Sequence, residues 1–64
     1  MHMTTRDCLT KALLDTQERV RDYMNYADQI EDHEIRQFFK SFAEIEGQHA
    51  QRLQGFIKEA TNSR

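Results

Sequence analysis

The second half of the chain decides the fold, and from Ile35 to Ala60 it reads IRQFFKSFAEIEGQHAQRLQGFIKEA. Its apolar residues return every three or four positions, which predicts an amphipathic α-helix from about residue 33 to residue 60. The predicted apolar seam of this helix contains eight residues: Ile35, Phe38, Phe42, Glu46, His49, Leu53, Phe56 and Ala60, with Phe39, Ile45 and Ile57 beside it. Two of the eight are polar, although the face they share is expected to be buried.

The first half of the chain carries the same kind of pattern, which predicts a helix from about residue 5 to residue 30. Its seam alternates steps of four and three residues: Leu9, Leu13, Val20, Tyr23, Ala27 and Ile30, with Thr16 in the one polar position. Glu31 to His33 form the break, and Asp32 is the predicted N-cap of the second helix. Because so short a connection makes the helices antiparallel neighbours, we expect an all-α, two-helix hairpin as one domain over residues 1–64.

The small size of the chain predicts a partner. A domain of 64 residues buries too little surface to be stable without disulfides, a metal or oligomerisation. A lone cysteine, Cys8, cannot form an internal disulfide, and we expect it to be a partly buried small apolar residue. Since each apolar stripe is wider than one neighbouring helix can cover, we expect a homodimer or higher oligomer, closing a four-helix bundle.

The composition of the chain bears on whether it binds nucleic acid or a membrane. The formal net charge is −2 and no basic patch stands out, so nucleic-acid binding is not expected. The sequence contains no run of eighteen apolar residues, so a membrane span is not expected. It shows no apolar leader segment either, so secretion is not expected. The expected location is therefore the cytoplasm.

The two polar seam residues of the second helix carry the chemical signal. On a helical wheel Glu46 and His49 both fall within about 40° of Phe42, so a carboxylate and an imidazole are expected to point into the core. Glu-x-x-His is the spacing of carboxylate-bridged di-metal bundles, and these donors suit iron, zinc or manganese. The alternative is a buried polar layer in which Glu46 and His49 pair with each other and with Thr16 and fix the register. Arg19 is expected to be ordinary surface charge.

Three segments carry a resemblance to a known family: Tyr23 to Ala27, Asp32 to Ile35, and Ala43 to Ala50. They resemble the ferritin-like superfamily, specifically its rubrerythrin and encapsulated-ferritin branches, over roughly Leu13 to Ile57. The resemblance implies a half-ferritin whose di-iron centre assembles between two hairpins and oxidises iron. It also implies that Glu46 and His49 are metal ligands.

The sequence departs from that family at one ligand. Members place a glutamate on the first helix, seven residues before the tyrosine matched by Tyr23 and thirty before the glutamate matched by Glu46. Both counts arrive at Thr16, which lacks a carboxylate, with Tyr23 close to the expected site. Two chains would then supply two carboxylates and two imidazoles, a set suited to one metal ion rather than two. The resemblance thus leaves two expectations, a metal-binding protein with weakened ferroxidase chemistry and a structural or interaction module without metal.

Overall fold

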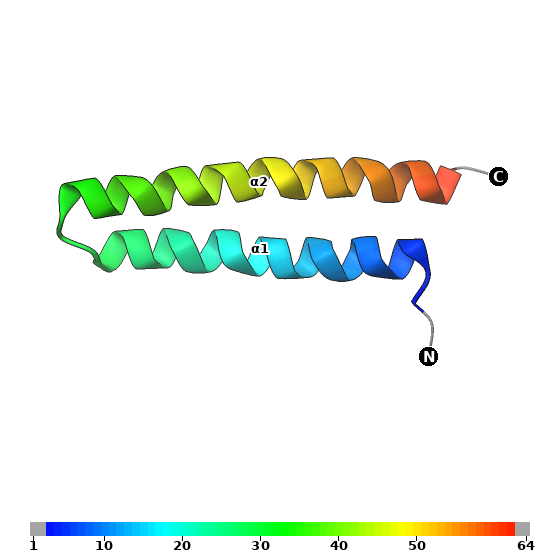
Figure 1. Cartoon of the computed structure of the whole chain (residues 1–64), viewed down its shortest axis with the longest axis horizontal. Helices are drawn as coiled ribbons and strands as arrows, with labels where there is room; N and C mark the ends of the chain where they lie inside the picture. Colours follow the sequence, from blue (N-terminus) through cyan, green and yellow to red (C-terminus); the bar gives the residue numbers. More distant parts are fainter. Residues whose placement is uncertain (1–2, 63–64) are drawn as a thin grey trace.

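Two antiparallel helices make up the part of the chain that the structure, a computed structural model, describes, residues 3–62. Helix α1 spans Thr5–Gln29 and helix α2 spans His33–Asn62, with no strand among the described residues. The helices lie side by side over their whole length and are joined at one end by a short turn (Figure 1). The predicted all-α hairpin is confirmed, and α2 continues two residues beyond its predicted end.

Side-chain caps fix the start of each helix. At the start of α1 the Thr4 hydroxyl accepts a hydrogen bond from the Asp7 amide, and the Asp7 carboxylate accepts one from the Thr4 amide. At the start of α2 the Asp32 carboxylate accepts a hydrogen bond from the Ile35 amide at 2.9 Å, which confirms Asp32 as the N-cap. The backbone is already extended at Ile30, so α1 has ended there.

The face of α1 that meets α2 is the seam that the sequence predicts. Thr16 and Ala27 are buried, and the remaining members are half-buried: Leu9, Leu13, Val20, Tyr23 and Ile30. Because α1 carries a single heptad stripe, the predicted seam is also the face that packs against α2.

The face of α2 that meets α1 differs from the predicted seam. The residues buried or half-buried on it repeat in steps of three and four, and they are Arg36, Phe39, Ala43, Glu46, Ala50, Leu53 and Ile57. Only two members of the predicted seam, Glu46 and Leu53, lie on this inner face. The prediction was wrong for the others because α2 carries two adjacent heptad stripes. The stripe with small Ala43 and Ala50 lets the helices approach closely.

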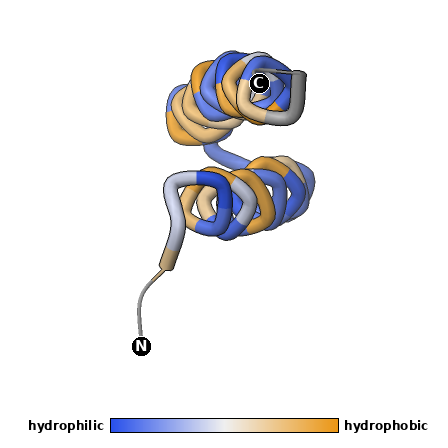
Figure 2. The backbone as a smooth tube through the Cα atoms, turned by 90° about the vertical axis from the view of Figure 1, so that its right-hand side faces the viewer, coloured by the Kyte–Doolittle hydropathy of each residue, from blue (hydrophilic) through white to orange (hydrophobic). Residues whose placement is uncertain are grey.

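The second stripe of α2 lies along one flank of the hairpin and stays largely exposed to solvent. We call it the outer stripe, and it consists of Ile35, Phe38, Phe42, Ile45, His49 and Phe56, all exposed. Phe38 retains 60% of its surface, and Ile45 retains 53%. In the view along the helices, hydrophobic segments of α2 reach one flank of the hairpin as well as the side that faces α1 (Figure 2).

An aromatic cluster covers the turn-proximal half of the hairpin on the same flank. Tyr23 meets Phe42 edge-on with ring centroids 4.7 Å apart, and Tyr26 meets Phe39 at 5.9 Å. Phe38 joins through both Phe39 and Phe42. These contacts tie the outer stripe to α1, so the exposed rings are held in place although one side of them faces solvent.

The hairpin is thin, and its accessible surface area is larger than that of a compact monomer of the same mass. Its extents are 50 × 24 × 11 Å, so the shortest dimension is that of one helix layer. The accessible surface is 5311 Å², whereas a compact 7.7 kDa monomer has about 4,300 Å². No described large side chain is fully buried. Neither helix, over the described residues, is long and apolar enough to cross a membrane.

Candidate functional site

Glu46 is the charged residue that the hairpin encloses. It lies on the inner face of α2, one turn from Ala43 and one turn from Ala50, and its side chain keeps only 11% of its surface. Small neighbours before and after it leave room for the carboxylate between the helices. A carboxylate in this position requires partners, because burying an unpaired one is costly.

Arg19 of α1 is the first partner, and the sequence prediction for it was wrong. Its Nε donates a hydrogen bond to Glu46 Oε2 at 2.8 Å, and its Nη2 donates one to Thr16 Oγ1 at 3.3 Å. The Arg19 side chain nevertheless stays 45% exposed. Arg19 lies three residues after Thr16, which places both on one side of α1. This three-residue spacing is the feature of the sequence from which a role for Arg19 beside Thr16 could have been predicted.

His49 is the second partner, but it does not point into the hairpin. Its Nδ1 lies 3.1 Å from Glu46 Oε1, while 65% of its side chain is exposed. The inward orientation predicted for Glu46 is thus confirmed, and the one predicted for His49 was wrong, since His49 belongs to the outer stripe. Because an ionised carboxylate only accepts hydrogen bonds, Nδ1 is the donor in this contact.

These contacts keep Glu46 ionised. Hydrogen bonds from His49 and then from Arg19 hold the pKa of the Glu46 carboxyl below its ordinary value, against the opposing effect of burial. The hydrogen bond to Glu46 likewise raises the pKa of the Arg19 guanidinium. At neutral pH the centre of the hairpin therefore contains one negative and one positive charge, which neutralise each other.

The arrangement does not fit a di-metal centre within one chain. Both carboxylate oxygens of Glu46 already have a hydrogen-bond donor, and one of these donors is a permanently charged guanidinium. Over residues 3–62 no three His, Cys, Asp or Glu side chains come together as a metal site. Thr16 is buried with its hydroxyl engaged by Arg19, and Tyr23 belongs to the aromatic cluster. Metal ligation by Glu46 and His49 stays a prediction that needs donors from a partner chain.

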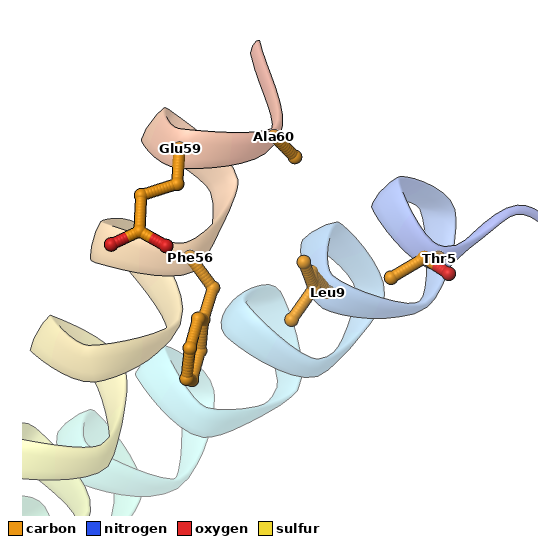
Figure 3. Close-up of a pocket in the computed structure, with 5 residues that line it drawn as sticks. All are labelled: Thr5, Leu9, Phe56, Glu59 and Ala60. Carbon is orange, nitrogen blue, oxygen red and sulfur yellow. The ribbon is translucent and has the colours of Figure 1, made fainter. Parts of the chain in front are cut away.

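Two open grooves lie elsewhere on the hairpin. The first, of about 500 Å³, is at the open end and is lined by Thr5, Leu9, Phe56, Glu59 and Ala60. There the Phe56 ring extends toward α1, with Leu9 and Thr5 across from it (Figure 3). The second groove is lined by Val20, Met24, Lys40, Ala43 and Glu44. The sequence did not predict either groove, and Cys8, expected to be partly buried, is exposed.

Comparison with known proteins identified no relative of this chain. No family model matches the chain, and neither does a curated protein or a solved structure. The resemblance to ferritin-like proteins remains a prediction from the quoted segments.

Proposed function

We propose that this chain is a structural, self-associating hairpin that works as a homodimer, two copies pairing through the outer stripe to form a four-helix bundle. The observation that carries the proposal is the exposure of that stripe. Five large apolar side chains repeat at helical spacing on one flank of α2, each at least 37% exposed: Ile35, Phe38, Phe42, Ile45 and Phe56. A contiguous apolar surface of this kind on a small protein marks an interface.

The size of the exposed surface supports a second copy as the partner. The chain has about 1,000 Å² more surface than a compact monomer of its mass, and a typical stable interface covers about 800 Å² on each partner. A two-fold dimer brings the same stripe from both chains together, so no other partner is needed to cover it. Two hairpins stacked in this way also convert a one-layer structure into the two-layer arrangement of stable domains.

The polar contacts at the centre support a structural role for Glu46. Arg19 of α1 donates a hydrogen bond to it across the interface and is itself held in place by Thr16 of the same helix, so sliding one helix along the other breaks the Arg19–Glu46 hydrogen bond. A charged layer of this kind contributes little net stability against an apolar one, but it penalises every register in which the charges are unpaired. Every described buried side-chain nitrogen or oxygen has a hydrogen-bond partner, so the hydrogen bonding of the layer is satisfied within one chain.

A ferritin-like metal-binding protein is the second candidate. The observation that favours it is the position of His49 on the outer stripe, hydrogen-bonded to Glu46. A partner docking on that stripe brings a second Glu46 and His49 toward the first pair. Four such donors would suit a single iron, zinc or manganese ion, provided that Arg19 releases the Glu46 carboxylate. Ferroxidase chemistry would require further carboxylates.

One experiment separates the two candidates. The purified protein is stripped with a chelator, and its mass and melting temperature are measured before and after addition of Fe²⁺, Zn²⁺ or Mn²⁺. The structural proposal expects a dimer whose mass and melting temperature do not depend on metal. A stripped protein that becomes monomeric, or a melting temperature that metal raises in the native chain but not in Glu46→Ala, contradicts it and favours the metal site.

A single substitution sharpens the distinction. Thr16→Glu restores a carboxylate where the ferritin-like pattern places one, in a position that is 3% exposed beside Arg19. The metal-site candidate expects this variant to bind iron, detected by elemental analysis. The structural proposal expects no bound metal and a lower melting temperature, because a second carboxylate competes for one guanidinium.

A further inference from the structure

The outer stripe also contains information about how two copies are oriented. We propose that the two hairpins pair head to tail, with α2 antiparallel to the partner's α2, so that the turn end of each copy enters the open-end groove of the other. The inference rests on the proposed dimer and adds to it the arrangement of the partner and the occupant of the groove.

The stripe can be paired antiparallel with itself along its whole length. It runs from Ile35 to Phe56, so its midpoint falls between residues 45 and 46. With a two-fold axis at that midpoint, Ile35 lies opposite Phe56 of the second copy, and Phe42 lies opposite His49. Each large side chain near the turn then meets the sparser half of the partner's stripe. A parallel pairing instead stacks the crowded aromatic halves on each other and leaves the sparse halves facing.

The open-end groove lies where this register places the turn end of the other copy. Phe56, Glu59 and Ala60 line the groove from α2, and they come level with Ile35, Asp32 and Glu31 of the second copy. The groove is lined mainly by apolar atoms and is open on one side (Figure 3). Ile35 is 48% exposed at the start of α2, and it is the side chain that this register places against the groove.

The charges of the two ends favour the same orientation. Residues 24–36 at the turn end contain four acidic side chains and one basic: Asp28, Glu31, Asp32, Glu34 and Arg36. Residues 3–15 and 52–60 at the open end contain four basic side chains and three acidic: Arg6, Lys11, Arg52, Lys58, Asp7, Asp15 and Glu59. Head-to-tail pairing places the turn end, with a net charge of −3 from these side chains, beside an open end with a net charge of +1, although Glu59 then comes level with Asp32 of the second copy. Parallel pairing brings two acidic turn ends together.

Arg52 adds a specific contact of the same kind. Its guanidinium lies over the Phe56 ring, 4.3 Å from the centroid, and is therefore held beside the outer stripe. In the antiparallel register it comes level with Phe38 and Phe39 of the second copy. Arginine stacks well on aromatic rings, so the open end offers a cation to the aromatic cluster of the partner.

Disulfide cross-linking in a Cys8→Ser background tests the register. Ile45→Cys lies close to the two-fold axis and is expected to cross-link to itself, because a disulfide needs Cα atoms within about 7 Å. Ile35→Cys and Phe56→Cys are expected to stay uncross-linked separately, since identical residues are about 32 Å apart along the helices at 1.5 Å per residue. Mixed together, these two variants are expected to form a heterodimeric cross-link. Gln51→Cys, exposed on another side of α2, is the control that stays uncross-linked.

A second measurement uses the native cysteine and leaves the stripe unchanged. A nitroxide on the exposed Cys8 reports the distance between the two open ends by pulsed electron paramagnetic resonance. The antiparallel register separates the labelled positions by about 25 Å or more along the helices, whereas parallel pairing places them side by side.

The outcomes distinguish this inference from the dimer on which it rests. Self-cross-linking of Ile35→Cys or Phe56→Cys, or a short distance between labels, in a protein of dimeric mass overturns the head-to-tail arrangement and leaves the dimer standing. A monomeric mass for the native chain overturns both. A mixed cross-link between Ile35→Cys and Phe56→Cys, with a long distance between labels, supports both.

Discussion

The residues buried between the two helices differ in kind from the exposed residues of the outer stripe. The four buried residues between the helices are Thr16, Ala27, Ala43 and Glu46, of which two are polar and two are small. The outer stripe contains three phenylalanines and two isoleucines, all exposed. The inner face thus supplies close approach and a defined register with only half-buried large apolar side chains around it, while five further large apolar side chains face solvent on the outer stripe. This difference supports the proposal that a second copy covers the outer stripe.

The largest effect is expected from placing charge on the outer stripe. Phe42→Glu combined with Ile45→Glu should weaken the dimer roughly a millionfold, taking about 2 kcal/mol for each central interface residue and counting both residues in both copies. Helix content should fall with it, because the separated hairpins have little core. Sedimentation velocity and circular dichroism measure the two effects.

The matched control for this variant lies on the second groove. Met24→Glu also places a carboxylate on an exposed apolar residue, but beside Lys40 and away from the stripe. It should leave the dimer intact. Equal loss of the dimer in both variants would show that association does not depend on the outer stripe.

The next largest effect concerns the charges on the inner face. Arg19→Leu removes the guanidinium and leaves the Glu46 carboxylate between the helices with His49 as its remaining partner, so the melting temperature should fall by several degrees. Arg19→Leu combined with Glu46→Leu removes both charges and should recover most of the loss. If the double variant is less stable than the single one, the pair contributes more than register.

A smaller effect is expected from acid. Because the pKa of Glu46 is lowered in the folded chain, its contribution to stability is complete above the ordinary glutamate pKa of about 4.3 and is lost as pH falls through the lowered value. The melting temperature of the native chain should therefore drop between pH 5 and the acid limit more steeply than that of Glu46→Gln. Glu44→Gln, which changes an exposed carboxyl on α2, should keep the native slope.

The smallest expected effect comes from the two glycines within α2. An added Cβ meets nothing within 4 Å at either Gly47 or Gly55, so alanine there should stabilise the helix by about 0.5–1 kcal/mol. Urea unfolding of each variant measures the gain. A dimer that Gly47→Ala weakens would place the partner close to Gly47 and would argue against an interface confined to the outer stripe.

The sequence predicted the helices, the turn and the Asp32 cap, because heptad spacing and capping chemistry are local. It misplaced the packed face of α2, because two heptad stripes overlap there and the bulky one was taken as the core. The stripe that contains Ala43 and Ala50 packs against α1 instead, because these small side chains allow closer contact between the helices. Glu46 was predicted as a residue in need of a partner, but Arg19 was assigned to solvent by its type. The chemistry of a site formed by two chains depends on contacts between chains, which the pattern of one chain does not specify.

The most direct test of the central claim is the mass of the native protein in metal-free buffer. Sedimentation equilibrium over a range of concentrations, with helix content followed in parallel, measures it. We expect a helical species of twice the 7.7 kDa chain mass, with helix content falling as dilution separates the chains. A fully helical monomer of 7.7 kDa at every concentration would contradict it, because the hairpin would then be stable with its outer stripe in water.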